Sequence, residues 1–133
     1  MRTQMVMQHQ AGPLIAVVDD DSAFIDLMAE LLVDEGFAVI SALSPSGAFE
    51  RLRQVQPALV ILDLHMAHPE GGWQIFSMLR HTPETARIPV LVCSADHRML
   101  RAKRSLIQRQ GGEVLEKPFH LERLLSMVRT MLA

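Results

Sequence analysis

The chain has 133 residues, of which 49% are hydrophobic and 21% are charged, and its net charge at neutral pH is −2. This length suits a single domain and this composition is that of an ordinary globular protein, so disordered and fibrous classes are excluded. The slightly negative charge gives no reason to expect a direct nucleic-acid partner. No apolar run approaches the roughly 20 residues that cross a bilayer, and residues 1–13 are too polar for a signal peptide. We therefore expect a cytoplasmic protein without membrane insertion.

Five short apolar runs predict β-strands, and residues 1–13 before them are expected to form a flexible N-terminal arm. The runs are LIAVV (14–18), FAVIS (37–41), ALVIL (58–62), PVLVC (89–93) and EVLE (113–116). The first, third and fourth runs are apolar on both faces of the strand, which is typical of parallel strands covered by helices. Cys93, the only cysteine, lies in the fourth run and is expected to be a small buried apolar residue.

Amphipathic patterns after the strands predict five helices. The second helix is expected to have Ser44 as its N-cap and Pro45 in its first turn, with Phe49 and Leu52 facing the core. Gly36 ends the first helix as a C′ residue. The apolar stripe of that first helix consists of Phe24, Leu27, Met28, Leu31 and Leu32. The remaining helices are expected over residues 73–81, 97–110 and 121–132.

Strict alternation of strands and helices predicts a single α/β domain over residues 14–133, with a doubly wound, five-stranded parallel sheet and five helices. Sheets of this kind bind ligands beyond the carboxyl ends of their strands. Polar residues follow four of the predicted strands at this edge: Asp19, Asp20 and Asp21, then Asp63, then Ser94, and finally Lys117 with Pro118. We therefore expect the functional site there.

The charges at this edge predict a metal ion and a phosphoryl group. Asp19, Asp20 and Asp63 carry three negative charges, and carboxylates about 5 Å apart repel by roughly 3 kcal/mol per pair at an effective dielectric constant near 20. Oxygen ligands favour Mg²⁺, which together with Lys117 makes the site neutral. Lys117 and the Ser94 hydroxyl can then contact the oxygens of a phosphoryl group, with Asp63 as the nucleophile.

The motifs VVDDD, ILDLHM, LVCSA and LEKPF, in this order, resemble the receiver domain of two-component response regulators over residues 14–132. The resemblance implies a flavodoxin-like fold with strand order 2-1-3-4-5. It also implies that Asp63 is the phosphoacceptor, that Asp20 binds the metal directly and that Asp19 binds it through water. The backbone carbonyl of His65 matches the third protein ligand of Mg²⁺ or Mn²⁺.

By the same resemblance, Ser94 matches a hydroxyl switch and Lys117 a phosphate-binding lysine, which a cis proline, here Pro118, usually follows. The implied phosphodonor is a histidine kinase or a histidine phosphotransfer protein. The implied effector is a protein that docks on the fourth helix, fifth strand and fifth helix. The chain is expected to be a signalling module rather than an enzyme, a monomer or weak dimer, and to contain no output domain because it ends with the fifth helix.

Two positions depart from the family pattern. Ala67 stands where a proline is usual, with Pro69 nearby, which leaves the loop geometry around the metal carbonyl open. Val114 stands where most members have an aromatic ring that turns inward when the domain is phosphorylated. We therefore expect a muted or differently routed structural change on the face of the fourth helix, fifth strand and fifth helix.

Several alternatives remain open at this point. One alternative is a binding module independent of phosphorylation. Another is an aspartate-nucleophile phosphatase, although His65 stands where such enzymes have a second aspartate. His65, His68 and Glu70 form a loose set that favours a transition metal only weakly. Asp21 and Ser22 are explained by the start of a helix. The fourth helix is a solvated face or a docking surface for an acidic partner through Arg98, Arg101, Lys103, Arg104 and Arg109.

Overall fold

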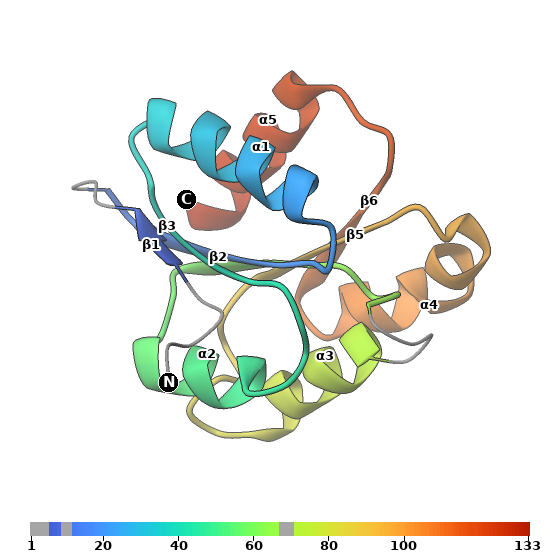
Figure 1. Cartoon of the computed structure of the whole chain (residues 1–133). Helices are drawn as coiled ribbons and strands as arrows, with labels where there is room; N and C mark the ends of the chain where they lie inside the picture. The colour runs from blue at the N-terminus through green and yellow to red at the C-terminus, as the bar shows by residue number, and fades with distance from the viewer. Residues whose placement is uncertain (1–5, 9–11, 67–70) are drawn as a thin grey trace.

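The computed structural model describes residues 6–8, 12–66 and 71–133, which form a central sheet between two layers of helices (Figure 1). The sheet has six strands in the order β1-β3-β2-β4-β5-β6. Five of them are parallel: β2 (Leu14–Val18), β3 (Ala38–Ala42), β4 (Leu59–Leu62), β5 (Val90–Ser94) and β6 (Gly112–Glu116). Numbered among themselves, these strands have the order 2-1-3-4-5, so the predicted flavodoxin-like fold is confirmed.

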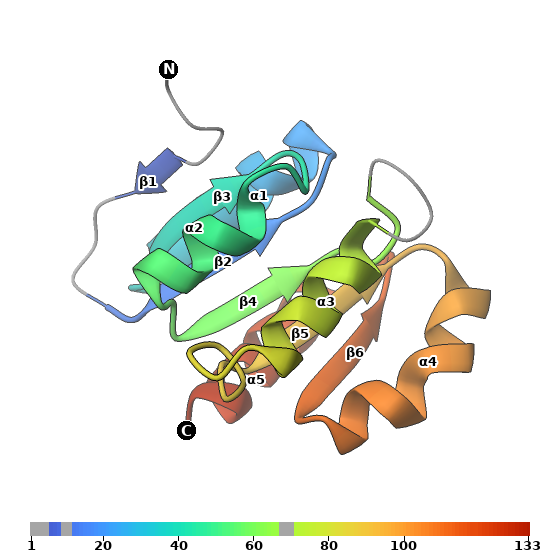
Figure 2. The same cartoon turned by 90° about the horizontal axis from the view of Figure 1, so that it is seen from below.

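The helices cover both faces of the sheet, as the views in Figures 1 and 2 show. One face carries α1 (Ser22–Asp34) and α5 (Leu121–Leu132), and the other carries α2 (Ala48–Val55), α3 (Gly71–His81) and α4 (His97–Arg109). Successive side chains of β2 alternate between the two cores, with Ile15 and Val17 packed towards α1 and α5, and Ala16 and Val18 towards the other layer. None of the helices in the described ranges is long and apolar enough to cross a membrane.

Helix α1 begins where Asp21 accepts hydrogen bonds from the amides of Ala23 and Phe24, at 3.0 and 3.3 Å. It ends before Gly36, whose positive φ of 95° confirms the predicted C′ glycine. The predicted apolar stripe is correct for Met28 and Leu32, which are fully buried, and wrong for Leu27, which is 47% exposed. The stripe is rotated because Ile25 occupies the core position instead.

The predicted start of the second helix is wrong. Helix α2 begins at Ala48, and its N-cap is Gly47 in the left-handed conformation, with φ of 75° and no side-chain cap. The predicted cap, Ser44, comes directly before the turn in which the Ala48 amide donates to the Pro45 carbonyl at 3.1 Å. Glycine adopts this conformation without a steric cost, so the chain completes a turn before the helix starts. Leu52 is fully buried and Phe49 packs against the core, as predicted.

Within the expected N-terminal arm of residues 1–13, Val6–Gln8 form strand β1 antiparallel to β3. Val6 is opposite Ser41 and Gln8 is opposite Val39. The free backbone groups of an edge strand such as β3 can pair with any extended segment, whatever its side-chain pattern. Sequence periodicity therefore gave no signal for a strand of three residues. Residues 1–5 and 9–11 lie outside the described residues.

Candidate functional site

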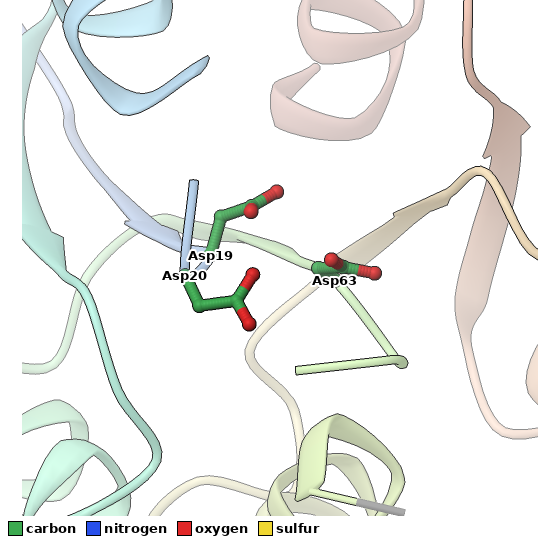
Figure 3. Close-up of side chains that lie close together, drawn as sticks. All are labelled: Asp19, Asp20 and Asp63. Carbon is green, nitrogen blue, oxygen red and sulfur yellow. The ribbon is translucent and has the colours of Figure 1, made fainter. Parts of the chain in front are cut away.

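The site forms at the carboxyl edge of the sheet because β2 and β4 end in register. Val18 pairs with Leu62, so that the next residues, Asp19 and Asp63, lie side by side. Both are buried, whereas Asp20 is exposed. One carboxylate oxygen from each of the three aspartates lies within 4.8 Å of the others. In Figure 3 the Asp20 side chain extends towards Asp63, and the three side chains lie next to one another at the strand ends.

Backbone amides orient the two buried carboxylates. The Asp21 amide donates to Oδ1 of Asp19 at 3.0 Å, and the His65 amide donates to Oδ1 of Asp63 at 3.1 Å. Lys117 Nζ donates to Oδ2 of Asp19 at 2.6 Å and lies 4.0 Å from Oδ2 of Asp63. The lysine is therefore close to Oδ2 of Asp63 but beyond hydrogen-bond distance from it.

The environment of Asp63 disfavours its charged form. Burial raises the pKa of the Asp63 carboxyl, and the negative charges of Asp19 and Asp20 raise it further, against the opposing effects of the His65 amide and Lys117. Three carboxylates and one ammonium group leave two excess negative charges in the site. A divalent cation matches this charge, and a donor set made only of oxygens fits Mg²⁺ or Mn²⁺.

Lys117 and Ser94 come to the same edge from β6 and β5. The Lys117 amide donates to the Ser94 carbonyl at 2.9 Å, and the peptide bond from Lys117 to Pro118 is cis, as the resemblance implied. The Ser94 hydroxyl is fully buried and accepts a hydrogen bond from the Asp96 amide at 3.0 Å. Each of the predicted site residues Asp19, Asp20, Asp63, Ser94 and Lys117 thus follows or ends a strand at one edge of the sheet.

The loop after β4 is described only in part. His65 is exposed, and its ring Nδ1 lies 3.6 Å from an Asp96 carboxylate oxygen. The described residues do not include Ala67, His68, Pro69 and Glu70. The family departure at Ala67 therefore lies outside the described residues, as do two members of the alternative transition-metal set, His68 and Glu70.

The structure adds residues that sequence reasoning missed. The Phe24 ring lies beneath Lys117, with its centroid 3.9 Å from Nζ. The His97 ring donates a hydrogen bond from Nε2 to the Lys117 carbonyl oxygen at 2.8 Å. A Cβ added to Gly72 would lie 1.9 Å from the Asp63 carbonyl oxygen. Only the pair of glycines at positions 71 and 72 was a signal of such close packing, because contacts between distant segments do not appear in periodicity.

Other predicted residues have the expected surroundings. Asp21 caps α1, so its role differs from those of Asp19 and Asp20 in the acidic cluster. Cys93 is fully buried, and burial raises the pKa of its thiol to about 12, so it is a core residue. Val114 is also buried, in the core between the sheet and α4. In helix α4 the arginines are exposed, whereas Lys103 lies 4.2 Å above the Trp73 ring.

The sequence profile of the response regulator receiver domain matches residues 15–129, and the chain belongs to this family. It is thus a receiver domain of two-component response regulators. It is 35% identical over 120 residues to the phosphate regulon transcriptional regulatory protein PhoB of Rhizobium meliloti, covering 90% of this chain and 52% of that protein. It is 33% identical over 120 residues to the DNA-binding dual master transcriptional regulator RpaA of Synechocystis, covering 90% and 49%.

Solved structures of receiver domains have the same fold as this chain. The receiver domain of NtrX from Brucella abortus is 27% identical, with a TM-score of 0.76 over 89% of this chain and 97% of that one. The receiver domain of the Francisella response regulator 1452, at 20% identity, shows the same fold with a TM-score of 0.77 over 91% of this chain and 97% of that one. This chain spans about half the length of the two curated relatives.

Proposed function

We propose that this receiver domain takes a phosphoryl group onto Asp63 from the phosphohistidine of a sensor kinase or a phosphotransfer protein, and that phosphorylation changes a protein-binding surface. The observation that carries the proposal is the position of Asp63, within 4.8 Å of two carboxylates and beside Lys117 at the edge of the sheet. Asp63 accepts one amide on Oδ1, and its Oδ2 is directed to the side where the lysine lies. We propose a cytoplasmic location for this reaction.

The reaction is a transfer between two nucleophiles. An oxygen of the Asp63 carboxylate attacks phosphorus, and the bond from phosphorus to the donor nitrogen breaks. The electron pair returns to the imidazole, which takes a proton from solvent. Lys117 Nζ and the Ser94 hydroxyl would bind the phosphoryl oxygens. The Ser94 hydroxyl accepts a hydrogen bond from the Asp96 amide, so its own proton is available to donate.

The acidic residues would hold the divalent cation. Asp20, Asp63 and the His65 backbone carbonyl would bind Mg²⁺ or Mn²⁺ directly, and Asp19 through a water molecule. The cation would supply charge neutralisation at the phosphoryl oxygens. Asp19 also fixes Lys117 through its Oδ2, so this aspartate would orient both positive charges of the site.

The phosphodonor protein has a suitable docking surface beside Lys117. An apolar groove of about 340 Å³ lies between the start of α1 and the loop from β6 to α5, and Leu27 and Leu121 are exposed there. The groove is lined by Phe24, Leu27, Met28, Ala95, Lys117, Pro118, Phe119 and Leu121. Because Lys117 lines the groove and also the acidic site, a partner seated here brings its phosphohistidine towards Asp63.

Charge substitutions in the groove test this docking surface. Leu27→Glu and Leu121→Glu are expected to slow phosphoryl transfer from a phosphorylated phosphotransfer protein and to leave transfer from acetyl phosphate unchanged. Met78→Glu, at a similarly exposed site on α3, is the matched control. If both donors slow equally, or if Met78→Glu has the same effect, the docking surface lies elsewhere.

The proposed effector surface is the face of α4, β6 and α5. Its groove of about 370 Å³ is lined by Val114 and Leu115 together with Arg104, His120 and Arg123, among others. Glu116 also lines the groove and lies 4.0 Å from Arg104, which leaves Arg123 as the arginine that suits an acidic group of a partner segment with an apolar side chain.

Intact mass spectrometry tests the proposed reaction. After incubation with acetyl phosphate and Mg²⁺, the protein is expected to gain one phosphoryl group, and to gain none in chelator or in the variant Asp63→Ala. A wild-type protein that gains no phosphoryl group from either a small donor or a phosphotransfer protein would favour the alternative of a phosphorylation-independent binding module.

A further inference from the structure

The ring of Phe24 lies against Lys117 at the edge of the acidic site. Its centroid lies 3.9 Å from Lys117 Nζ, the distance of a direct contact between a cation and an aromatic face. The same ammonium group donates a hydrogen bond to Asp19 at 2.6 Å. Lys117 thus contacts both a carboxylate and a ring, and only 18% of its side chain is exposed.

The ring itself is fixed from two directions. The Phe24 amide donates to the Asp21 carboxylate that caps α1, and the Phe119 ring packs edge-on against Phe24 with centroids 6.1 Å apart and an interplanar angle of 84°. Phe119 lies two residues after Lys117. The start of α1 and the loop after β6 therefore meet at Phe24, next to the lysine that both segments surround.

A ring is a suitable partner for this lysine because it attracts a cation without carrying a charge. A further carboxylate in this position would raise the excess negative charge of the site from two to three. A purely aliphatic side chain would not attract the ammonium group, and Asp19 alone would then hold the flexible lysine.

We propose that Phe24 is a positioning residue for Lys117, whose ammonium group it holds between Asp19 and Asp63 in readiness for the phosphoryl oxygens. The inference rests on the proposed function, in which Lys117 binds the phosphoryl group. Phe24 also lines the docking groove, so a partner seated in the groove contacts the residue that positions the lysine.

Two substitutions separate the aromatic face from simple packing. Phe24→Leu keeps an apolar side chain and removes the ring, whereas Phe24→Tyr keeps the ring. The first readout is the NMR signal of the Lys117 ε-methylene protons, which a ring so close shifts upfield. We expect this shift in the wild type and in Phe24→Tyr, and its loss in Phe24→Leu.

The second readout is the rate of phosphorylation by acetyl phosphate with Mg²⁺. We expect a decrease of about tenfold in Phe24→Leu, the size of one well-desolvated cation–π contact, and a rate near that of the wild type in Phe24→Tyr. Trp73→Leu is the matched control, because it removes the contact of Lys103 with Trp73 on the other helical layer. It is expected to leave the phosphorylation rate unchanged.

Three results would overturn the inference: no upfield shift of the Lys117 protons in the wild type, an equal rate in Phe24→Leu and Trp73→Leu, or an equal loss in Phe24→Tyr and Phe24→Leu. Failure of the proposed function would look different. The wild type would then take up no phosphoryl group, while the NMR shift would still decide whether Phe24 positions the lysine.

Discussion

Three consecutive aspartates have three different environments in this protein. Asp19 is buried and binds Lys117, Asp20 is exposed at the acidic cluster, and Asp21 caps α1. The separate role of Asp21 was predictable, because a helix start needs one capping side chain and not three. The pairing of Lys117 with Asp19 at 2.6 Å, closer than with Asp63, was not predictable, since strand order places all these residues at one edge without fixing their rotamers.

The different roles of Asp20 and Asp21 predict different effects of substitution. Asp20→Asn is expected to weaken Mg²⁺ binding at least about tenfold, because it removes a charged oxygen ligand. Asp21→Asn keeps the cap and is expected to leave Mg²⁺ affinity unchanged. Asp21→Ala is expected to lower the free energy of unfolding by about 1 kcal/mol through loss of the cap. Calorimetric Mg²⁺ titration and urea unfolding measure these effects; equal losses of affinity in Asp20→Asn and Asp21→Asn would contradict the assignment.

The raised pKa of Asp63 predicts a pH-dependent stability of the metal-free protein. Burial, followed by the charge of Asp19, raises this pKa in the folded state above its unfolded value. The contribution of Asp63 to stability is therefore complete below the unfolded-state pKa and is lost as the pH rises through the folded-state pKa. At neutral pH in chelator, we expect Asp63→Asn to be more stable than the wild type, by on the order of 1 kcal/mol.

Urea unfolding at a series of pH values measures this difference between Asp63→Asn and the wild type. The difference should shrink as the pH falls through the acidic range and should be largest at neutral pH. A difference that stays constant, or that grows towards acid, would show that the carboxylate is not destabilised in the folded state.

At the scale of elements, long amphipathic and apolar segments were predictable and short irregular ones were not. All five parallel strands and five helices lie within a few residues of their predicted ranges, because burial on one or both faces sets their sequence patterns. The start of α2 was wrong because Gly47 allows a turn that propensity at Ser44 does not reveal. Strand β1 depends on backbone pairing with an edge, which leaves no periodic pattern in three residues.

The close approach of α3 to the two residues that follow Leu62 at the end of β4 predicts that Gly72 does not tolerate a side chain. A Cβ at this position would lie 1.9 Å from the Asp63 carbonyl oxygen and 2.6 Å from the Leu64 Cα, both of which are backbone atoms. Gly72→Ala is expected to cost about 2 kcal/mol of stability or more, and to slow phosphorylation by displacing Asp63. Gln74→Ala, at an exposed position of α3, is the control. Unchanged unfolding and phosphorylation in Gly72→Ala would contradict this packing.

At the scale of the whole molecule, the site and the proposed effector surface are joined through β5, β6 and α4. Val92 pairs with Val114 between the two strands, and Val114 is buried in the core that also contains Leu100 and Ile107 of α4. The resemblance to receiver domains implies an aromatic ring at this position, whereas this chain has a small side chain with one rotatable bond. A rotation of an aromatic side chain cannot relay the change here.

We therefore expect a muted or differently routed response on the face of α4, β6 and α5. Amide chemical shifts measured before and after addition of Mg²⁺ and beryllofluoride should change strongly around Asp63 and Ser94, and only weakly across that face. Asp63→Ala, which cannot hold the mimic, is the control. Large chemical-shift changes across the whole face would contradict this expectation, because they would show that the structural change reaches the face without an aromatic residue at position 114.

The central claim is that Asp63, among the three clustered aspartates, is the phosphoacceptor. Reduction of the phosphorylated protein with borohydride converts an aspartyl phosphate into homoserine with loss of phosphate, and peptide mass spectrometry then locates the converted residue. The account predicts homoserine at position 63 alone, dependent on the phosphodonor and on Mg²⁺. Conversion at Asp19 or Asp20, or a phosphorylated protein that contains no homoserine after reduction, would contradict it.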